Sequence, residues 1–120
     1  MLNKSTIKDL YVAIDSMDAV NFASFIAVDG SFQFGNWAPV VGRSSIEPVV
    51  AGFYSSIKSL THTLVDAVED GNDLISRGMV TYTRHNGSTL TIPFCNYFKM
   101  ENGLVKDYQI YADVSTLYAE

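Results

Sequence analysis

Asn96 is a polar side chain in an otherwise apolar, strand-like segment. Because side chains alternate between the two faces of a strand, Asn96 shares one face with four apolar residues, at positions 92, 94, 98 and 100. A buried amide must find hydrogen-bond partners, or its burial destabilises the fold. Its NH₂ group could donate to the carbonyl of a bound ligand, or the amide could be tied to the backbone or to another side chain.

His62 and Asp113 are titratable side chains at opposite ends of the β-rich half of the chain. The imidazole of His62 suits proton transfer near neutral pH, because its ordinary pKa is about 6.5. If Asp113, at the end of the last strand, lay at the mouth of an apolar cavity, its carboxylate would have a raised pKa and could also move protons. We therefore hypothesise an acid–base pair of His62 and Asp113 across a pocket. The alternatives are a structural histidine bonded to the backbone and a solvated or turn-capping aspartate.

Helical periodicity dominates the start of the sequence. Apolar residues at positions 7, 10, 11 and 14 predict an amphipathic helix that ends near Asp15 and carries Tyr11 on its inner stripe. Asp18 is the expected N-cap of a second helix, and Gly30 is its expected end. Residues 31–34 alternate between polar and aromatic side chains and predict a short strand.

A third helix is expected to begin at a capping box formed by Ser44 and Glu47. Its apolar stripe runs from Ile46 to Ile57 and is the clearest helical pattern in the chain. Gly52 lies in the middle of this helix and predicts close packing against a neighbouring element. The first half of the chain is therefore expected to be mainly helical.

The second half of the sequence is rich in β-forming residues. Four such runs follow one another from His62 to Asp113, separated by Asp-Gly or Asn-Gly pairs at 70–71, 86–87 and 102–103. These pairs accept positive φ and are strong hairpin signals, so they predict an antiparallel meander. Helices first and strands later predict an α+β fold, and 120 residues predict one domain over 1–120.

Composition narrows the expected partners and compartment. The net charge is −5 and the eight Lys and Arg residues are scattered, which argues against nucleic acid and anionic membranes as partners. Cys95 is the only cysteine, so no internal disulfide is expected. The sequence shows no secretory signal and no apolar run of about 20 residues, so we expect a cytoplasmic protein. No metal or cofactor is expected, because no Cys/His cluster, phosphate loop or dinucleotide fingerprint occurs.

Large aromatic side chains are plentiful, with seven Phe, seven Tyr and one Trp. Such rings fill a core, and they also line pockets for apolar ligands. Core packing and a pocket wall explain the individual residues equally well. The candidates for a pocket wall are Phe34, Trp37, Phe53, Tyr54, Tyr82, Phe94 and Phe98.

Five segments in a fixed order carry a resemblance to a known family. They are residues 22–29 (FASFIAVD), 41–46 (VGRSSI), 60–63 (LTHT), 92–98 (IPFCNYF) and 103–113, which opens with GLV and closes with YAD. Together they resemble the SnoaL-like branch of the nuclear-transport-factor-2-like superfamily, also called the ketosteroid-isomerase-like fold. The resemblance implies a cone-shaped, curved antiparallel sheet wrapped on a long helix, with two further N-terminal helices and the order α-α-β-α-β-β-β-β. It also implies a homodimer formed through the sheet face.

The resemblance assigns roles to several polar positions. Asn96 resembles the protonated aspartate of the isomerases' oxyanion hole, and Tyr11 resembles the tyrosine of that hole. The alternative for Tyr11 is a core residue with its hydroxyl at the surface. Asp113 resembles the acid–base aspartate of a SnoaL-like cyclase. Phe34 stands where the isomerases carry their general base, so steroid isomerisation by that mechanism is not expected.

We therefore expect a small-molecule enzyme of the SnoaL-like kind, with cofactor-free acid–base chemistry on an apolar, carbonyl-bearing substrate. The reaction would be an isomerisation, a cyclisation or a lyase-type dehydration. Asp113 and His62 would act as base and acid, while Asn96 and Tyr11 would donate hydrogen bonds to the developing enolate oxygen. The alternative is a non-catalytic domain of the same fold that binds a small ligand or forms a dimer.

Overall fold

The computed structural model describes residues 4–118 and contains three helices and six strands in that part of the chain. The expected α+β order is confirmed, with one two-residue strand added before the third helix. In chain order the elements are α1 (Lys4–Asp15), α2 (Ala19–Ala23), β1 (Ile26–Phe34), β2 (Val40–Val41), α3 (Arg43–Ser55), β3 (Ser59–Asp70), β4 (Asp73–Thr83), β5 (Thr89–Glu101) and β6 (Leu104–Tyr111).

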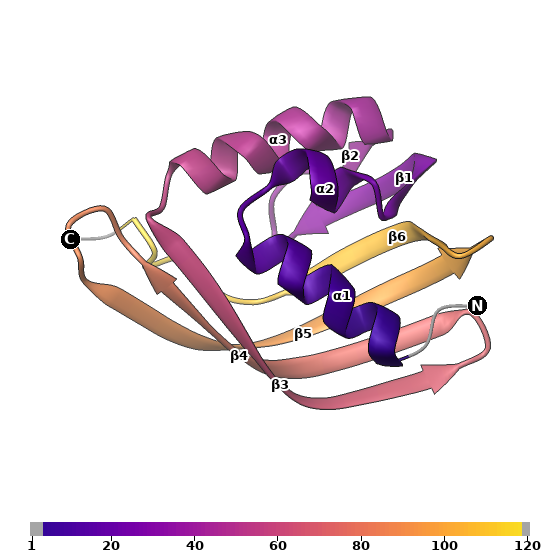
Figure 1. The fold of residues 1–120 in the computed structure, drawn as a ribbon. Helices are drawn as coiled ribbons and strands as arrows, with labels where there is room; N and C mark the ends of the chain where they lie inside the picture. Colours follow the sequence, from indigo (N-terminus) through magenta and orange to yellow (C-terminus); the bar gives the residue numbers. More distant parts are fainter. Residues whose placement is uncertain (1–3, 119–120) are drawn as a thin grey trace.

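The strands form one curved sheet with the order β2-β1-β6-β5-β4-β3. Strands β3 to β6 make the predicted antiparallel meander, and β1 joins it by pairing in parallel with β6. The three helices lie on the concave side of the sheet, and its convex side is left uncovered by them (Figure 1). The predicted cone is therefore confirmed, with its interior between the helices and the sheet.

Short connections join the strands of the meander at or beside the predicted dipeptides, over residues 71–72, 84–88 and 102–103. Gly71, Gly87 and Gly103 all have positive φ, and Asn102 shares this conformation with a φ of 53°. Only glycine, and less readily Asn or Asp, adopts these angles without steric cost. The hairpin connections predicted from these pairs are confirmed.

A close approach between β3 and β4 accompanies the curvature of the sheet. The β3–β4 register shifts between Leu64 and Asp66, opposite Gly78 of β4. A Cβ atom added to Gly78 would lie 2.0 Å from the backbone carbonyl oxygen of Thr63, which no real side chain tolerates. Bulges of this kind bend a strand and increase its twist, so Gly78 permits the bend of the meander around the helices.

The region between α1 and β2 differs from the prediction. Helix α2 ends at Ala23, and the segment expected to be its second half is the start of β1. The amide of Val105 donates to the carbonyl of Phe25, and Ile26 pairs with Val105. Pairing with β6 therefore overrides the helical spacing of the apolar residues in this segment. Asp18 is the N-cap of α2, as predicted, and its carboxylate accepts a hydrogen bond from the amide of Asn21.

Helix α3 also begins differently from the prediction. Its N-cap is Gly42, which makes no side-chain capping bond, so the expected box at Ser44 is not formed. Ser44 lies inside the first turn, because the carbonyl of Gly42 already accepts the amides of Ser45 and Ile46. Gly52 is exposed and a Cβ added there would meet nothing within 4 Å, so its expected close packing was wrong.

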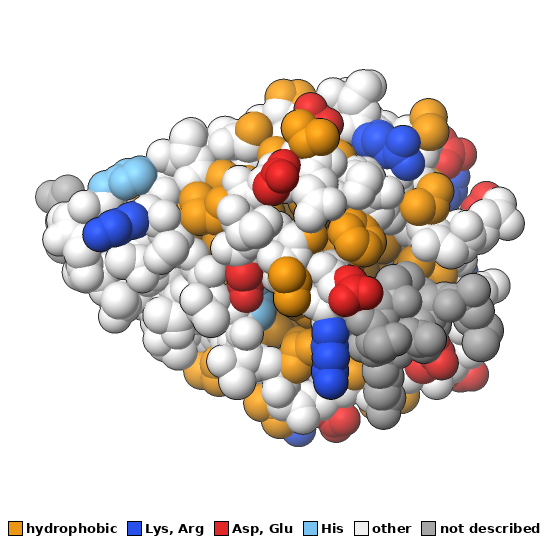
Figure 2. All heavy atoms as spheres, viewed as in Figure 1, with side chains coloured by type: hydrophobic (Ala, Val, Ile, Leu, Met, Phe, Trp, Pro, Cys, Tyr) orange, Lys and Arg blue, Asp and Glu red, His pale blue; other side chains and the backbone are white. Residues whose placement is uncertain are grey.

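A buried core of aliphatic and aromatic residues fills most of the space between the helices and the sheet. The last described turn is part of this core, since Val114 and Leu117 are buried. The guanidinium of Arg84 holds that turn by donating to the carbonyls of Thr116 and Leu117. On the face seen in Figure 2, acidic and basic side chains are scattered, with no broad patch of one charge. Within residues 4–118, no helix has the length and apolar character needed to cross a membrane.

Candidate functional site

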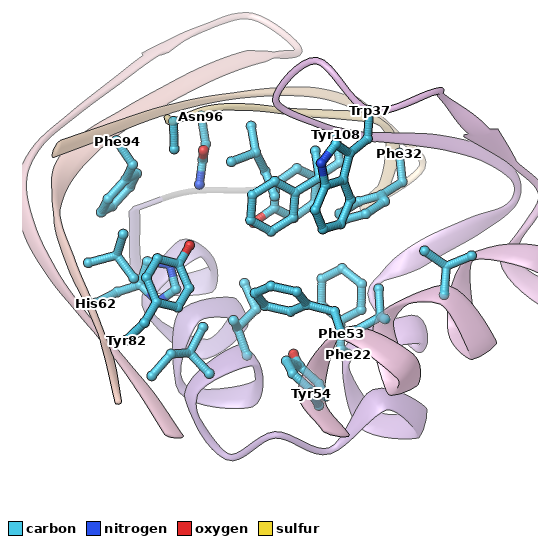
Figure 3. A pocket seen from close by; sticks show the side chains of 18 residues that line it. Phe22, Phe32, Trp37, Phe53, Tyr54, His62, Tyr82, Phe94, Asn96 and Tyr108 are labelled. Atoms are coloured by element: carbon cyan, nitrogen blue, oxygen red, sulfur yellow. The ribbon is translucent and has the colours of Figure 1, made fainter. Parts of the chain in front are cut away.

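A small apolar cavity lies inside the cone, between α3 and the concave face of the sheet. It has a volume of about 40 Å³ and is lined mainly by aromatic side chains (Figure 3). Its rings come from α2, β1, the segment after β1, α3, β4, β5 and β6, so both the helices and the sheet contribute to the wall. The aromatic lining residues are Phe22, Phe32, Phe34, Trp37, Phe53, Tyr54, Tyr82, Phe94 and Tyr108. The polar side chains of His62 and Asn96 also line this wall.

The wall contains most of the aromatic residues that the sequence indicated as pocket candidates. Phe98 does not line the cavity, because its ring packs in the core against Tyr108, with 4.5 Å between ring centroids. Phe22, Phe32 and Tyr108 are lining residues that the sequence reasoning missed. Their burial is readable from periodicity, but no local signal distinguishes a cavity wall from solid core.

His62 is held by Asp15, the last residue of α1. The Nδ1 atom of His62 lies 2.6 Å from Oδ1 of Asp15, and the backbone amide of His62 donates to Oδ2 at 2.9 Å. The His62 side chain is only 8% exposed, while that of Asp15 is 26% exposed. An imidazole fixed by a carboxylate at Nδ1 keeps its Nε2 atom available for proton transfer.

The expected pairing of His62 with Asp113 is not formed. Asp113 lies beyond the end of β6, is exposed and does not line the cavity. Its carboxylate accepts a hydrogen bond from the amide of Ser115, and hydrogen bonding to Ser115 lowers the pKa of Asp113 below its ordinary value. The raised pKa expected for Asp113 was therefore wrong, because the carboxylate caps a turn in water instead of facing an apolar space.

Asn96 points inward from β5, as predicted, and takes part in a buried network. Its Nδ2 atom donates to the Tyr11 hydroxyl at 2.8 Å, and that hydroxyl shares a second hydrogen bond of 2.7 Å with Ser76. All three side chains are buried. The amide is thus tied to another side chain through its NH₂ group, one of the two interpretations drawn from the sequence.

Tyr11 lies behind the cavity wall, between α1 and the sheet. Its ring centroid is 4.9 Å from that of His62 and 5.7 Å from that of Phe94. Burial raises the pKa of Tyr11 to about 12, so its hydroxyl stays protonated at physiological pH. Tyr11 is therefore a buried residue that supports both polar members of the wall, His62 by packing and Asn96 by a hydrogen bond.

Asp15 is the functional candidate that sequence reasoning missed. It stands one helical turn after Tyr11, so a carboxylate on the same side of α1 as Tyr11 was readable from the spacing. What could not be read was its partner, 47 positions away on β3. Within residues 4–118, no group of three or more His, Cys, Asp or Glu side chains is arranged to hold a metal ion.

A family model described as a SnoaL-like domain matches residues 7–108 of the chain. No curated protein matches this chain significantly. Solved structures with a very similar fold are numerous, and three of them illustrate the range of that similarity. All three share less than a fifth of their residues with this chain, so they establish its fold and not its activity.

The first is a hypothetical protein with a ketosteroid isomerase-like fold from Catenulispora acidiphila DSM 44928, in complex with trimethylamine. It has a TM-score of 0.87 and 15% identity over 98% of this chain and 92% of that one. TerC, co-crystallised with polyporic acid, has a TM-score of 0.81 and 16% identity, with 95% and 93% covered. A putative SnoaL-like polyketide cyclase from Jannaschia sp. CCS1 has a TM-score of 0.81 and 12% identity, with 94% and 86% covered.

Proposed function

The chain belongs to the SnoaL-like domain family, and from that premise we propose that it binds an apolar small molecule in the aromatic-lined cavity and transfers a proton there. The observation that carries the proposal is the contact between Asp15 and His62 at the cavity wall. The similarity of the chain to a structure co-crystallised with polyporic acid and to a putative polyketide cyclase supports the proposed binding of a small molecule.

The chemistry follows from the way Asp15 holds the imidazole. The carboxylate accepts the Nδ1 proton of neutral His62, so the lone pair is on Nε2. Nε2 can then remove a proton from a carbon next to a carbonyl group and return it elsewhere, with Asp15 stabilising the imidazolium in between. Isomerisation, cyclisation and dehydration all begin with such a step, and none of them needs a cofactor.

Ligand entry requires the cavity to widen. An apolar cavity of about 150 Å³ is known to bind benzene, whereas this one has about 40 Å³. Two lining residues at its rim are the least buried, Trp37 at 38% exposure and Val49 at 40%. Trp37 stacks on Phe34 and contacts the edge of Phe53. We propose that displacement of the Trp37 side chain opens the site.

The narrowness of the cavity favours a second candidate function. If the aromatic side chains keep the cone filled, the domain binds a small ligand or a protein partner without turnover. The two functions differ in one testable respect, since only the enzyme needs a basic nitrogen at His62. Removal of that nitrogen abolishes proton transfer in the first case and has no catalytic consequence in the second.

Two measurements test the proposal. Trp37 is the only tryptophan, so its fluorescence reports ligand entry directly during titration with neutral ketones, from cyclopentanone to 2-tetralone. NMR then follows deuterium uptake from heavy water at the carbon next to the carbonyl of any ketone that binds. We expect His62→Gln to slow the catalysed uptake by about 10²–10⁴-fold.

His85→Gln is the matched control, because His85 is exposed and bonds only to the carbonyl of Ser55 among the described residues. It should leave the exchange rate unchanged. Binding without catalysed exchange in the unmodified protein would establish the second candidate. Absence of any fluorescence change with every ketone would contradict the cavity as a binding site for neutral ketones.

The convex face of the sheet supports a further proposal, a homodimer formed through this face. No helix within residues 4–118 covers the convex side of the sheet (Figure 1). Exposed apolar side chains lie on neighbouring strands of that side. Large apolar exposed faces of this kind mark protein contacts. The exposed or partly exposed apolar residues concerned are Val65, Ile75, Met79, Pro93, Cys95, Tyr97 and Tyr111.

A further inference from the structure

We propose that the cavity selects a ligand with a flat apolar ring that carries a neutral hydroxyl group, which donates a hydrogen bond to Oδ1 of Asn96. This inference rests on the proposed binding of a small molecule in the same cavity. It reverses the role expected for Asn96 from the sequence, where its NH₂ group would donate to a ligand carbonyl.

The hydrogen bonds of Asn96 determine which of its atoms is available. Its Nδ2 atom already donates to Tyr11, and Tyr11 is fixed in turn by Ser76. Oδ1 is buried and has no hydrogen-bond partner among the described residues. Asn96 as a whole is 1% exposed, and its amide projects into the space shown in Figure 3. The acceptor atom is therefore the unsatisfied end of the amide.

The neighbours of Asn96 do not supply the missing donor. On β6 its register partner is Ile110, which also lines the cavity, and on β5 its inward neighbours are Phe94 and Phe98. On β4 its partner is Ser76, whose hydroxyl is engaged with Tyr11. Buried acceptors in folded proteins nearly always find a donor, because leaving one unpaired is costly. No side chain among these neighbours donates to Oδ1, and a molecule in the cavity is the proposed source of that donor.

A hydroxyl group suits this place better than a group that only donates. The Tyr82 hydroxyl makes no hydrogen bond within the described part of the chain, and in Figure 3 it points towards the Asn96 amide from β4, the strand beside β5. Burial raises the pKa of Tyr82, so the phenol keeps its proton and can donate it. A ligand hydroxyl can donate to Asn96 Oδ1 and accept from Tyr82 at the same time.

The shape of the cavity defines the rest of the ligand. Nine aromatic side chains line a space of small volume, so a flat ring that slides between their faces displaces the fewest of them. Among the side chains that the structure describes, no Lys or Arg lines the cavity, which disfavours an anionic ligand. A phenol is the simplest molecule that meets these conditions, and toluene is its match in size without the hydroxyl.

The test compares phenol with toluene in the unmodified protein and three variants by NMR titration of backbone amides. We expect the ratio of their dissociation constants to favour phenol in the unmodified protein, and Asn96→Leu to shift that ratio by at least about tenfold towards toluene. Tyr82→Phe should shift it in the same direction by a smaller factor. It removes a hydroxyl with no partner in the described chain, so it tests the inference even if Asn96→Leu fails to fold. Tyr97→Phe removes a hydroxyl that binds Asp73, away from the cavity lining, and should leave the ratio unchanged.

The outcomes separate this inference from the proposed function. Equal ratios in the unmodified protein, Asn96→Leu and Tyr82→Phe would overturn the role of Asn96 and leave the cavity as a binding site. Failure of both probes to bind, with ketones still changing Trp37 fluorescence, would overturn the hydroxyl-bearing ring as the ligand class. Failure of every probe and every ketone would overturn the inference together with the proposed binding of a neutral apolar molecule.

Discussion

The carboxylate of Asp15 binds His62 at two points, one oxygen at the imidazole Nδ1 and the other at the backbone amide. This contact joins the last residue of α1 to the beginning of β3. It fixes both the position of the strand and the orientation of the ring that it carries. The geometry of the candidate base is therefore determined by how a helix docks on the sheet, and not by a loop.

We predict that Asp15→Asn impairs proton transfer far more than stability. The Asn carbonyl can still accept the backbone amide of His62, but its NH₂ group would donate to Nδ1 and place the imidazole proton on Nε2. We expect a loss of about 10²–10⁴-fold in catalysed deuterium exchange, and a loss of about 1 kcal/mol in the free energy of unfolding. NMR exchange rates and urea unfolding measure the two effects.

Asp18→Asn is the matched control for this substitution. Asp18 is exposed and caps α2, and Asn is an equally good N-cap, so neither measurement should change appreciably. Equal exchange rates in Asp15→Asn and the unmodified protein would remove the Asp15–His62 pair from the mechanism.

A second prediction concerns the bend of the meander at Gly78. Gly78→Ala places a methyl group 2.0 Å from the carbonyl oxygen of Thr63, so the two strands must separate. We expect a loss of about 3 kcal/mol or more in the free energy of unfolding. Gly52→Ala makes the same chemical change at an exposed helical position with free space, and should stabilise by about 0.5–1 kcal/mol. Similar stabilities for the two variants would show that the close approach does not constrain the sheet.

A third prediction concerns alkaline pH. Burial raises the pKa of Tyr11 from 10.0 to about 12 and raises those of Tyr54, Tyr82 and Tyr108 as well. The unfolded chain therefore loses these protons first, so stability is complete below about pH 10 and falls as the pH rises above it. We expect the buried phenols to ionise only as the protein unfolds, which simultaneous tyrosinate absorbance and circular dichroism can follow. Full ionisation with unchanged circular dichroism would contradict their burial.

A fourth prediction tests the proposed dimer. Ile75 is 44% exposed on the convex face, so Ile75→Lys would place a charge at the centre of the contact. We expect the dimer to dissociate at concentrations where the unmodified protein is dimeric, as measured by light scattering after size-exclusion chromatography. Val12→Lys is the control, because Val12 is even more exposed but lies on α1. Identical masses for all three proteins would argue against this face.

The strands were largely predictable from the sequence, and the reason lies in local chemistry. The glycine of each turn pair, as in Asn102-Gly103, adopts positive φ at low cost, and alternation alone orients Asn96 inward. The start of β1 was not predictable, since Ile26 has helical spacing and becomes a strand only through pairing with Val105. A local sequence pattern fails to predict the structure where the backbone hydrogen-bonds to a strand that is distant in sequence.

The site was predictable residue by residue but not as a set. Sequence reasoning found His62, Asn96 and Tyr11, and the structure brings these three together. It paired His62, expected at the start of the first long strand, with Asp113, expected at the end of the last strand, across a common pocket. In the structure β6 ends at Tyr111, two residues before Asp113, and the Asp113 side chain is exposed. The partner actually used, Asp15, belongs to a helix whose approach to β3 has no signature in the sequence.

The parallel pairing of β1 with β6 has a consequence for how the protein folds. Phe32 meets Tyr108 and Ser31 meets Asp107, contacts that span 76 positions of the chain. Pairings of such long range close late and slow the folding reaction, because a large loop must be ordered before they form. These contacts between β1 and β6 complete the wall of the cavity. A nascent chain in which β6 has not yet been synthesised therefore lacks part of the aromatic wall, and it cannot enclose the cavity.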